Sequence, residues 1–284
     1  MSPKAETISI FFRDIESIAD IREIEDLQIE VWGDDERDIV PLNQLVAARY
    51  VGGTLIGAFD GKKLVGFVYG FYGHLRGSVV HHSHMLAVLP AYRSHDVALR
   101  LKLAQRERVL ADRIADRITW TFDPLQSLNA HFNFAKLGVV TDTYKVDVYG
   151  DAGTSFLHRN GTDRFFVTWL VESEWVRNRI LKQSIPARSY TSALQLLGTS
   201  SSGLPERRAN PDELSGADSV LIGIPANINE IEKSNFDVAR LWREETRRAF
   251  SESLAQGFVV TEYFLENNDT GNYVLERKHI EDFR

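Results

Sequence analysis

The sequence predicts an α/β protein in which a mixed sheet flanked by helices is followed by a smaller C-terminal α/β extension. Three observations predict this class. Strand-like and amphipathic helical segments alternate through the first half of the chain. Two strand–helix units follow each other directly, which favours parallel neighbours in a central sheet covered by helices. A second run of strands and a helix then follows a polar stretch over 198–216.

The elements of the first half follow from local signals. Apolar residues recur every three or four positions over 18–32, which is the spacing of an amphipathic helix. Gly61, between two β-rich segments, supplies the positive φ that a tight hairpin turn needs. Pro90 ends a strand, and Gly138 ends a helix as its C-cap. The sequence predicts strands over 8–12, 54–59, 64–72, 78–89 and 118–122, and helices over 18–32, 42–50, 97–110 and 125–137.

The remainder of the chain is richer in strands. Residues 139–148 and 165–171 are predicted to pair as a long hairpin that completes the first sheet. The composition changes from Ser173 onward, so we predict one domain over 1–172 and an α/β extension over 173–284. Within the extension the predicted elements are strands over 219–224, 258–265 and 273–275 and a helix over 236–255.

The composition is that of a globular protein, and it excludes several classes of site. Of 284 residues, 43% are hydrophobic and 26% are charged. There is no cysteine, which excludes disulfides, thiolate zinc sites, iron–sulfur clusters and a cysteine nucleophile. A net charge of −7 gives no general attraction to nucleic acid or anionic lipid. Because no apolar run approaches the roughly 20 residues of a membrane helix and no signal-peptide pattern is present, we expect a soluble, cytoplasmic protein with no nucleic-acid or membrane partner.

The most informative stretch is HSHMLAVLPAYRSHDVA at 82–98, which leads into the helix over 97–110. It resembles the cofactor motif of the GNAT superfamily of acyl-CoA-dependent N-acyltransferases. In that motif a strand reading L-x-V-x-P-x-x-R runs into a loop of the form Q/R-x-x-G-x-G/A and then into a helix. The strings HSHMLAVLPAYR, LKLAQRE, WTFDPLQSLNAHFN and KLGVV also resemble a long-chain branch of predicted acetyltransferases with an extra C-terminal region. The resemblance covers about the first 170 residues.

The resemblance implies an acyl-CoA co-substrate, acetyl-CoA by default, and a small-molecule primary amine, such as an amino acid, as acceptor. Some members of the narrower branch transfer succinyl groups, so succinyl-CoA is the alternative donor. Backbone N–H groups at a helix N-terminus bind a pyrophosphate, and Arg93 adds a positive charge. In the superfamily the strands matching 78–89 and 118–122 splay apart, which frees backbone groups to bond the pantetheine arm and to stabilise the oxyanion. The implied cofactor-binding residues are Leu86, Ala87, Val88, Arg93, Ser94, His95, Asp96, Val97, Ala98 and Asn129.

Two residues depart from the superfamily pattern. Asp96 stands where the central glycine of the loop is usual, and glycine is favoured there because the backbone must approach phosphate closely. Aspartate is a preferred N-cap residue, and its carboxylate would bond the same helical N–H groups that the pyrophosphate needs. Phe134 stands where the superfamily often has a tyrosine that protonates the departing thiolate; Tyr144 is the candidate replacement, with a packing role as the alternative. These departures leave a catalytically degenerate GNAT-like binding or regulatory module as the alternative function.

Two histidines are the candidates for the base. Transfer to an amine requires a proton acceptor near the thioester. On the alternation of a regular strand, His82 and His84 share a face with Leu86 and Val88, and His81 points to the other face. His84 and His82 are therefore the predicted bases, with half-buried histidines bonded to backbone as the alternative. No third ligand at suitable spacing accompanies them, so no metal site is predicted.

Other polar residues have two interpretations. Asp123, before Pro124, either binds a substrate ammonium or forms a strand-end turn. Asn129 and Asn133 are four positions apart and are predicted to face the same way on their helix. The helix over 236–255 interleaves glutamates with arginines, which predicts a solvated face rather than a nucleic-acid patch, and its apolar stripe fits either the core or a homodimer surface. Its arginines are Arg240, Arg243, Arg247 and Arg248.

Overall fold

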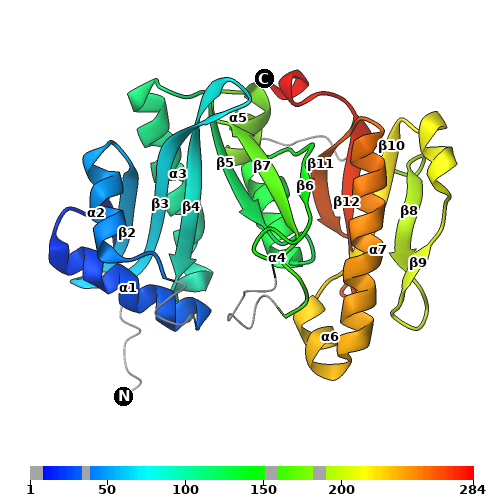
Figure 1. Cartoon of the computed structure of the whole chain (residues 1–284), viewed down its shortest axis with the longest axis horizontal. Coiled ribbons are helices and arrows are strands. Elements are labelled where there is room, and N and C mark those ends of the chain that lie inside the picture. Colours follow the sequence, from blue (N-terminus) through cyan, green and yellow to red (C-terminus); the bar gives the residue numbers. More distant parts are fainter. Residues whose placement is uncertain (1–8, 34–38, 151–158, 182–189) are drawn as a thin grey trace, which may run out of the picture. The chain divides into compact units, whose positions relative to one another are not determined.

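The computed structural model describes residues 9–33, 39–150, 159–181 and 190–284. The described residues fall into two compact units, the first ending at Ile118 and the second running from Thr119 to Arg284. Each unit combines paired strands with covering helices (Figure 1), so the predicted α/β class is confirmed. Among the described residues, no helix is both long enough and apolar enough to cross a membrane.

The first unit is an antiparallel sheet with helices on both faces. Its strands are hydrogen-bonded in the order β1-β2-β3-β4. Figure 1 shows β2, β3 and β4 of this sheet. Tyr69 of β3 bonds Gln44 of α2 on one face, whereas Tyr72 bonds Asp112 of α3 on the other. The elements are β1 (Ile10–Asp14), α1 (Ile18–Trp32), α2 (Leu42–Tyr50), β2 (Thr54–Asp60), β3 (Lys63–Leu75), β4 (Ser78–Val88), the 3-10 helix η1 (Pro90–His95) and α3 (Val97–Asp112).

Local signals set the boundaries of these elements. Ser17 caps α1, because its hydroxyl oxygen accepts a hydrogen bond from the Asp20 N–H at 3.0 Å. Gly61 has a φ of 59° in the turn between β2 and β3, as the sequence predicts. The helices and the sheet enclose one hydrophobic core, which includes Ile21, Ile24, Leu27, Phe59, Phe67, Val97 and Leu101.

The second unit contains two groups of paired strands. One group has the order β5-β7-β6, and the other has the order β11-β12-β10-β8-β9, in which β8 and β10 are parallel. The long helix α7 lies along the second group (Figure 1). The elements are β5 (Arg117–Phe122), which begins in the first unit, α4 (Ser127–Ala130), the π-helix η2 (His131–Leu137), β6 (Tyr144–Lys145), β7 (Arg164–Leu170), α5 (Glu174–Ile180), β8 (Leu194–Thr199), β9 (Pro205–Arg207), η4 (Pro211–Gly216), β10 (Ser219–Pro225), α6 (Ile228–Ser234), α7 (Phe236–Ala255), β11 (Phe258–Leu265), β12 (Thr270–Arg277) and η5 (Ile280–Phe283).

The first arm of the predicted hairpin, residues 139–148, is not a continuous strand. Only the two residues of β6 form one. Val140 instead pairs with Thr168 of β7, and Thr141 pairs with Val260 of β11. This short segment therefore joins β7 on one side to β11 on the other. The sequence indicates the β propensity of the segment, but its partners are decided by tertiary packing.

The second unit contains an aromatic cluster whose members come from before and after residue 172 in the sequence. The Phe134 ring lies 5.7 Å from the Tyr273 ring, and the Phe165 ring lies 4.7 Å from the Phe250 ring. These contacts join residues that precede the predicted boundary to residues that follow it. The division of the chain at residue 172 stays a prediction, and α5, β8, β9 and α6 are elements that the sequence analysis missed.

Candidate active site

β4 carries a one-residue bulge at His84. Met85 lies opposite Tyr69 of β3, but Ser83 lies opposite Gly70. His84 is therefore the extra residue between two adjacent cross-strand pairs. A bulge of this kind interrupts the alternation of side chains along the strand that carries it.

The bulge changes which side chains share a face of the sheet. Leu86 and Val88 lie opposite even-numbered residues of β3, and so does His81, whereas His82 lies opposite an odd-numbered residue. The predicted sharing of a face by His82 and His84 with Leu86 and Val88 is therefore wrong. The prediction that His81 and His82 point to opposite faces is confirmed. Regular alternation does not hold across this bulge, which the sequence does not reveal.

His82 and His84 form one cluster with two aromatic rings of β3. Their ring centroids are 6.2 Å apart, and they lie 5.7 and 5.9 Å from the Phe71 ring. The Tyr69 ring lies 5.8 Å from His84. Burial, with the nearby charges of His84 and Lys102, lowers the pKa of His82 to about 4. The His84 residue is exposed, but the Tyr69 and Phe71 rings beside its imidazole remove part of the hydration of the ring, which lowers the pKa of His84. Both imidazoles are therefore neutral at pH 7 and able to accept a proton.

The opposite face of β4 carries a buried polar cluster that includes two residues of α3. Lys102 Nζ donates to Ser83 Oγ and to Gln105 Oε1, each at 3.0 Å. Gln105 Nε2 lies 3.4 Å from His81 Nε2. All four side chains are buried, and burial lowers the pKa of Lys102 well below its usual value. The sequence analysis missed Lys102 and Gln105; the available signal was their position on the apolar side of the helix.

We expect His81 to make the folded chain sensitive to acid. Burial, with the charges of Lys102 and His82 nearby, lowers the pKa of His81 to about 3. A histidine in the unfolded chain has a pKa of about 6.5, so the unfolded state binds its proton first as the pH falls. His81 alone should therefore lower the free energy of unfolding by about 1.4 kcal/mol for each pH unit below about 6.5, until its folded pKa is reached. Urea unfolding at a series of pH values measures this slope.

His81→Gln removes the titrating ring, so the free energy of unfolding of this variant should fall less steeply between about pH 6.5 and 4. His74→Gln, at an exposed position of β3, is the matched control and should keep the wild-type slope. Equal slopes for the wild type and the His81 variant would contradict the burial of a neutral imidazole at this position.

The turn after β4 is fixed by contacts with neighbouring strands. Arg93 Nε donates to the Val88 carbonyl oxygen at 3.3 Å, which draws the side chain toward the end of β4. Tyr92 donates its hydroxyl proton to Asp60 Oδ2 at 2.8 Å. Arg93 remains exposed, directly before α3. The arginine that the sequence predicts as a phosphate ligand is thus accessible to a ligand at the start of that helix.

Asp96 begins α3 in the left-handed conformation, with φ 53° and ψ 22°. Aspartate is among the few residues other than glycine that adopt this conformation readily. The position of Asp96 as N-cap is confirmed, but the predicted role of its carboxylate is wrong, because the side chain makes no capping hydrogen bond with α3. The first N–H groups of a helix have no partner within the helix, so the cap does not consume the donors that an anion needs.

The other predicted cofactor-binding residues lie at the end of β4, in η1 and at the start of α3, apart from one. Asn129 is exposed on α4, in the second unit. Buried positions among them offer backbone groups rather than side chains to a ligand. Arg93, Ser94, His95 and Asp96 are exposed, Leu86 and Ala98 are half-buried, and Ala87, Val88 and Val97 are buried. Among the described residues, no group of three or more histidine or acidic side chains is placed to hold a metal ion.

Tyr144 belongs to a polar network of the second unit. Its hydroxyl donates to Asp163 Oδ2 at 2.6 Å, and Arg247 Nε donates to the same carboxylate oxygen at 2.8 Å. The Tyr144 ring is stacked 5.7 Å from the Phe250 ring. Burial is the main cause that raises the pKa of Tyr144 well above its usual value, and the nearby negative charge of Asp163 is the second. These contacts are the ones expected if Tyr144 has a packing role. A role for Tyr144 as proton donor stays a prediction.

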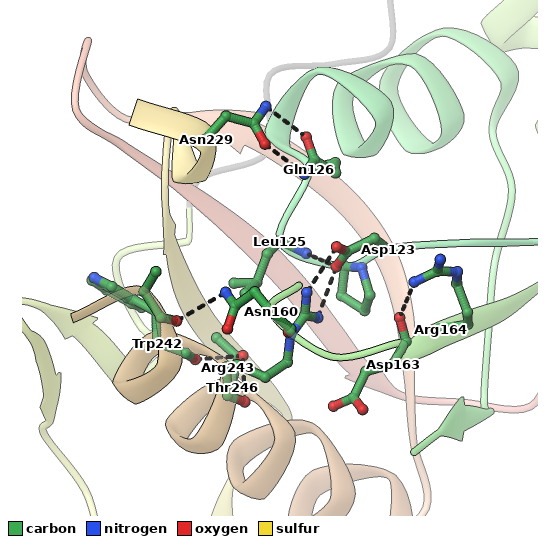
Figure 2. Close-up of polar contacts among 12 residues, drawn as sticks. Asp123, Leu125, Gln126, Asn160, Asp163, Arg164, Asn229, Trp242, Arg243 and Thr246 are labelled. Atoms are coloured by element: carbon green, nitrogen blue, oxygen red, sulfur yellow. Dashed lines mark hydrogen bonds and ion pairs between the residues drawn. The ribbon is translucent and has the colours of Figure 1, made fainter. Parts of the chain in front are cut away.

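Asp123 ends β5 in a turn and is held by an arginine of α7. Its Oδ1 accepts the Leu125 N–H at 2.9 Å, so the strand-end turn is confirmed. The two terminal nitrogens of Arg243 donate to the two carboxylate oxygens at 2.8 and 2.7 Å (Figure 2). The Arg243 Nε donates to the Asn160 carbonyl oxygen at 2.7 Å. Because both oxygens of Asp123 are engaged, the interpretation of this residue as an ammonium ligand is not supported.

Only some of the arginines of α7 are exposed to solvent, as the predicted solvated face requires. Arg240 and Arg248 are exposed and pair with acidic residues of the same helix. Arg243 is buried, and Arg247 bonds Asp163 at 2.8 Å. The prediction is wrong for these two, because their carboxylate partners lie about a hundred positions away in the sequence.

The apolar stripe of α7 lies mainly in the core. Trp242 and Ala249 are buried, and the Trp242 indole N–H donates to the Gly203 carbonyl oxygen at 3.2 Å. Leu241 is exposed. The core interpretation of the stripe is confirmed at the two buried positions, and a homodimer surface stays a prediction.

The helix predicted over 125–137 changes its pitch after one turn. It begins as α4 and continues as the π-helix η2. Asn129 is exposed, whereas Asn133 is buried and accepts the Trp120 indole N–H at 3.2 Å. Their predicted common orientation is wrong, because one side chain lies at the surface and the other in the interior. Phe134 is fully buried, with its ring in the aromatic cluster of the second unit.

Comparison with solved structures gives matches over a little more than half of the chain. A structure of the NatC complex bound to Gag peptide and CoA covers 57% of this chain and 98% of its own, at 15% identity and a TM-score of 0.45. An acetyltransferase of the GNAT family from Streptococcus pneumoniae covers 56% and 98%, at 14% and 0.45. The ribosomal-protein-S18-alanine N-acetyltransferase from Escherichia coli covers 57% and 94%, at 11% and 0.46. No protein-family model and no curated protein sequence matches. All three TM-scores lie below 0.5.

Proposed function

We propose that the chain is a cytoplasmic N-acyltransferase. It would move an acetyl group, with succinyl as the alternative, from acyl-CoA to the primary amine of a small molecule such as an amino acid. The observation that carries this proposal is the turn between β4 and α3. There the exposed Arg93 precedes a left-handed residue, Asp96, which begins a 16-residue helix. Glycine, which is usual at this position of the resembled motif, adopts the left-handed conformation readily.

The start of α3 has the properties of an anion site. Its first N–H groups lack helical partners, and the helix dipole places partial positive charge at this end. The side chain of Arg93 adds a full charge beside them. The resembled motif and these donors indicate the same ligand, the pyrophosphate of acyl-CoA.

In the proposed reaction the amine nitrogen attacks the carbonyl carbon of the thioester, and His84 accepts the proton that the nitrogen loses. Backbone N–H groups near Val88 stabilise the negative oxygen. A C–N bond forms, the C–S bond breaks, and its electron pair leaves with the sulfur. A thiol pKa of about 8.5 makes the thiolate a fair leaving group without a proton donor. Tyr144 would serve as that donor only if its hydroxyl left Asp163.

The alternative function is a binding or regulatory module that has lost catalysis. Two observations favour it. The Asp96 carboxylate adds negative charge at the position that would face the pyrophosphate. Phe134, at the position of the superfamily tyrosine, has no hydroxyl and is fully buried.

Binding of acyl-CoA distinguishes the two functions. Acetyl-CoA or succinyl-CoA at 100 times its Kd should stabilise the wild type by about 2.7 kcal/mol, measured as a thermal shift. Asp96→Gly should bind the same donor about tenfold more tightly, because a carboxylate beside the phosphates is removed while the left-handed conformation is retained. Release of the CoA thiol in the presence of an amino-acid panel then tests acyl transfer.

Glu107→Gln is the matched control, since it removes an exposed carboxylate from the middle of the same helix and should leave the Kd unchanged. Arg93→Gln should weaken binding. No thermal shift for the wild type with either donor, together with a shift for Asp96→Gly, would favour the degenerate module. No shift for either protein would reject the anion site itself.

A further inference from the structure

Lys102 is a buried amine that the proposed reaction does not use. It lies on α3, and its side chain reaches the face of β4 opposite to His82 and His84. Its relative exposure is 2%, and burial keeps the pKa of the amine well below the usual value. Burying an amine is costly unless it is hydrogen-bonded, so its contacts need an explanation beyond packing.

Lys102 and its neighbour Gln105 contact two residues of β4, Ser83 and His81, that alternate with the two candidate bases. Ser83, which accepts from Lys102 Nζ at 3.0 Å, stands between His82 and His84 in the strand. Lys102 also donates to Gln105 Oε1 at 3.0 Å, and Gln105 Nε2 lies 3.4 Å from His81 Nε2. One helix therefore holds the residues on both sides of His82, including the residue that directly precedes the bulge.

Apolar packing already attaches α3 to the sheet. Leu101 and Val109 of α3 are fully buried. A methionine at position 102 would add to this packing without the cost of desolvating an amine, and such replacements of buried polar groups are often neutral or stabilising. The polar cluster is thus better explained by the orientation that it imposes on β4 than by stability. A hydrogen bond to Ser83 has a preferred distance and angle, so it restricts the orientation of this residue beside the bulge more narrowly than apolar contacts do.

We propose that Lys102 is a positioning residue for His84, acting through Ser83 on the bulge of β4. The amine holds Ser83 against α3, so that His84 is directed to the other face, beside Phe71 and Tyr69. The proposal rests on the proposed function only in naming His84 as the base. The orientation of His84 itself is a property of the folded chain, and it is measurable without acyl-CoA.

NMR titration of the histidine ring protons in the full chain tests this role. In Lys102→Met, His84 should leave its ring cluster and become more hydrated, so its pKa should rise toward the usual value. The pKa of His82 should rise as well, because the nearby charge of Lys102 is lost. Thermal unfolding should show equal or greater stability of this variant. Lys102→Gln keeps an N–H donor for Ser83 and should retain a titration curve of His84 closer to that of the wild type.

Arg100→Met is the matched control on the same helix, since Arg100 bonds the backbone of β1 and not β4. It should leave both titrations unchanged. If acyl transfer is established, Lys102→Met should lower kcat about tenfold, move the pH profile with the His84 titration and leave the Kd for acyl-CoA unchanged. An unchanged His84 titration in Lys102→Met would overturn the proposal, whether or not the variant is less stable. Failure of acyl-CoA binding alone would instead reject the proposed function.

Discussion

A chain that ends at Glu172 is expected to be insoluble or unfolded, although the sequence predicts a domain boundary there. Phe165 and Phe134 are fully buried, and the rings that cover them include Phe250 and Tyr273. Burial of one such side chain contributes about 1.5–3 kcal/mol, and a domain has only about 5–15 kcal/mol of net stability. Removal of the C-terminal residues therefore uncovers enough apolar surface to offset the stability of what remains.

The backbone leads to the same expectation. Thr141 pairs with Val260, and its N–H and carbonyl oxygen form two hydrogen bonds to β11 at 3.1 and 2.8 Å. Loss of β11 leaves these groups unpaired beside an open strand edge, which promotes aggregation. The soluble fraction and the cooperativity of urea unfolding of fragment 1–172, compared with the full chain, measure the effect.

Co-expression with fragment 173–284 is the control for this truncation. The second fragment should restore solubility if the loss is one of packing partners. A soluble fragment 1–172 that unfolds cooperatively would contradict the expectation and would establish the sequence-based boundary as a real domain limit.

The sequence predicts well those features that depend on neighbouring residues. The β2–β3 hairpin follows from Gly61, and the end of β4 follows from Pro90. The position of Asp96 as the N-cap of α3 is also local, since aspartate is a preferred residue at a helix start. These residues make up most of the proposed anion site, which explains why that part of the site is visible in the sequence.

Features that depend on distant partners are not visible in this way. The bulge at His84 exists only in the pairing of β4 with β3, and it reassigns Leu86 and Val88 to the other face. Asn133 is buried against Trp120 of β5 while Asn129 is exposed, and this difference also depends on a distant partner. Lys102 lies on the apolar side of its helix, but its polar partner Ser83 becomes apparent only when α3 is laid on β4.

Replacing Arg243 by alanine is expected to lower the free energy of unfolding by about 3–5 kcal/mol. The Arg243 side chain is 4% exposed and forms a bidentate ion pair with Asp123 at 2.8 and 2.7 Å. Its Nε also bonds the Asn160 carbonyl oxygen at 2.7 Å. Alanine removes all three bonds and leaves a carboxylate in a half-buried position without this cation. Urea unfolding of the wild type and the variant at neutral pH measures the difference.

Arg240→Ala is the matched control, because Arg240 lies three residues earlier on α7 and its side chain is 64% exposed. Its ion pairs, at 3.5 and 3.9 Å within the helix, are of the exposed kind, so a change of at most about 0.5 kcal/mol is expected. A loss below about 1 kcal/mol for Arg243→Ala would mean that the pair is hydrated or replaced in solution.

A double-mutant cycle separates the worth of the ion pair from the cost of breaking it. If most of the loss in Arg243→Ala comes from stranding Asp123, then adding Asp123→Ala should recover part of the stability instead of adding a second loss. Replacing Arg243 by methionine and Asp123 by leucine together should come closer still to the wild type, since a buried ion pair and a well-packed apolar pair are often similar in stability. Additive losses in the cycle would instead assign the effect to the bond from Arg243 to Asn160, which the variants of Asp123 leave untouched.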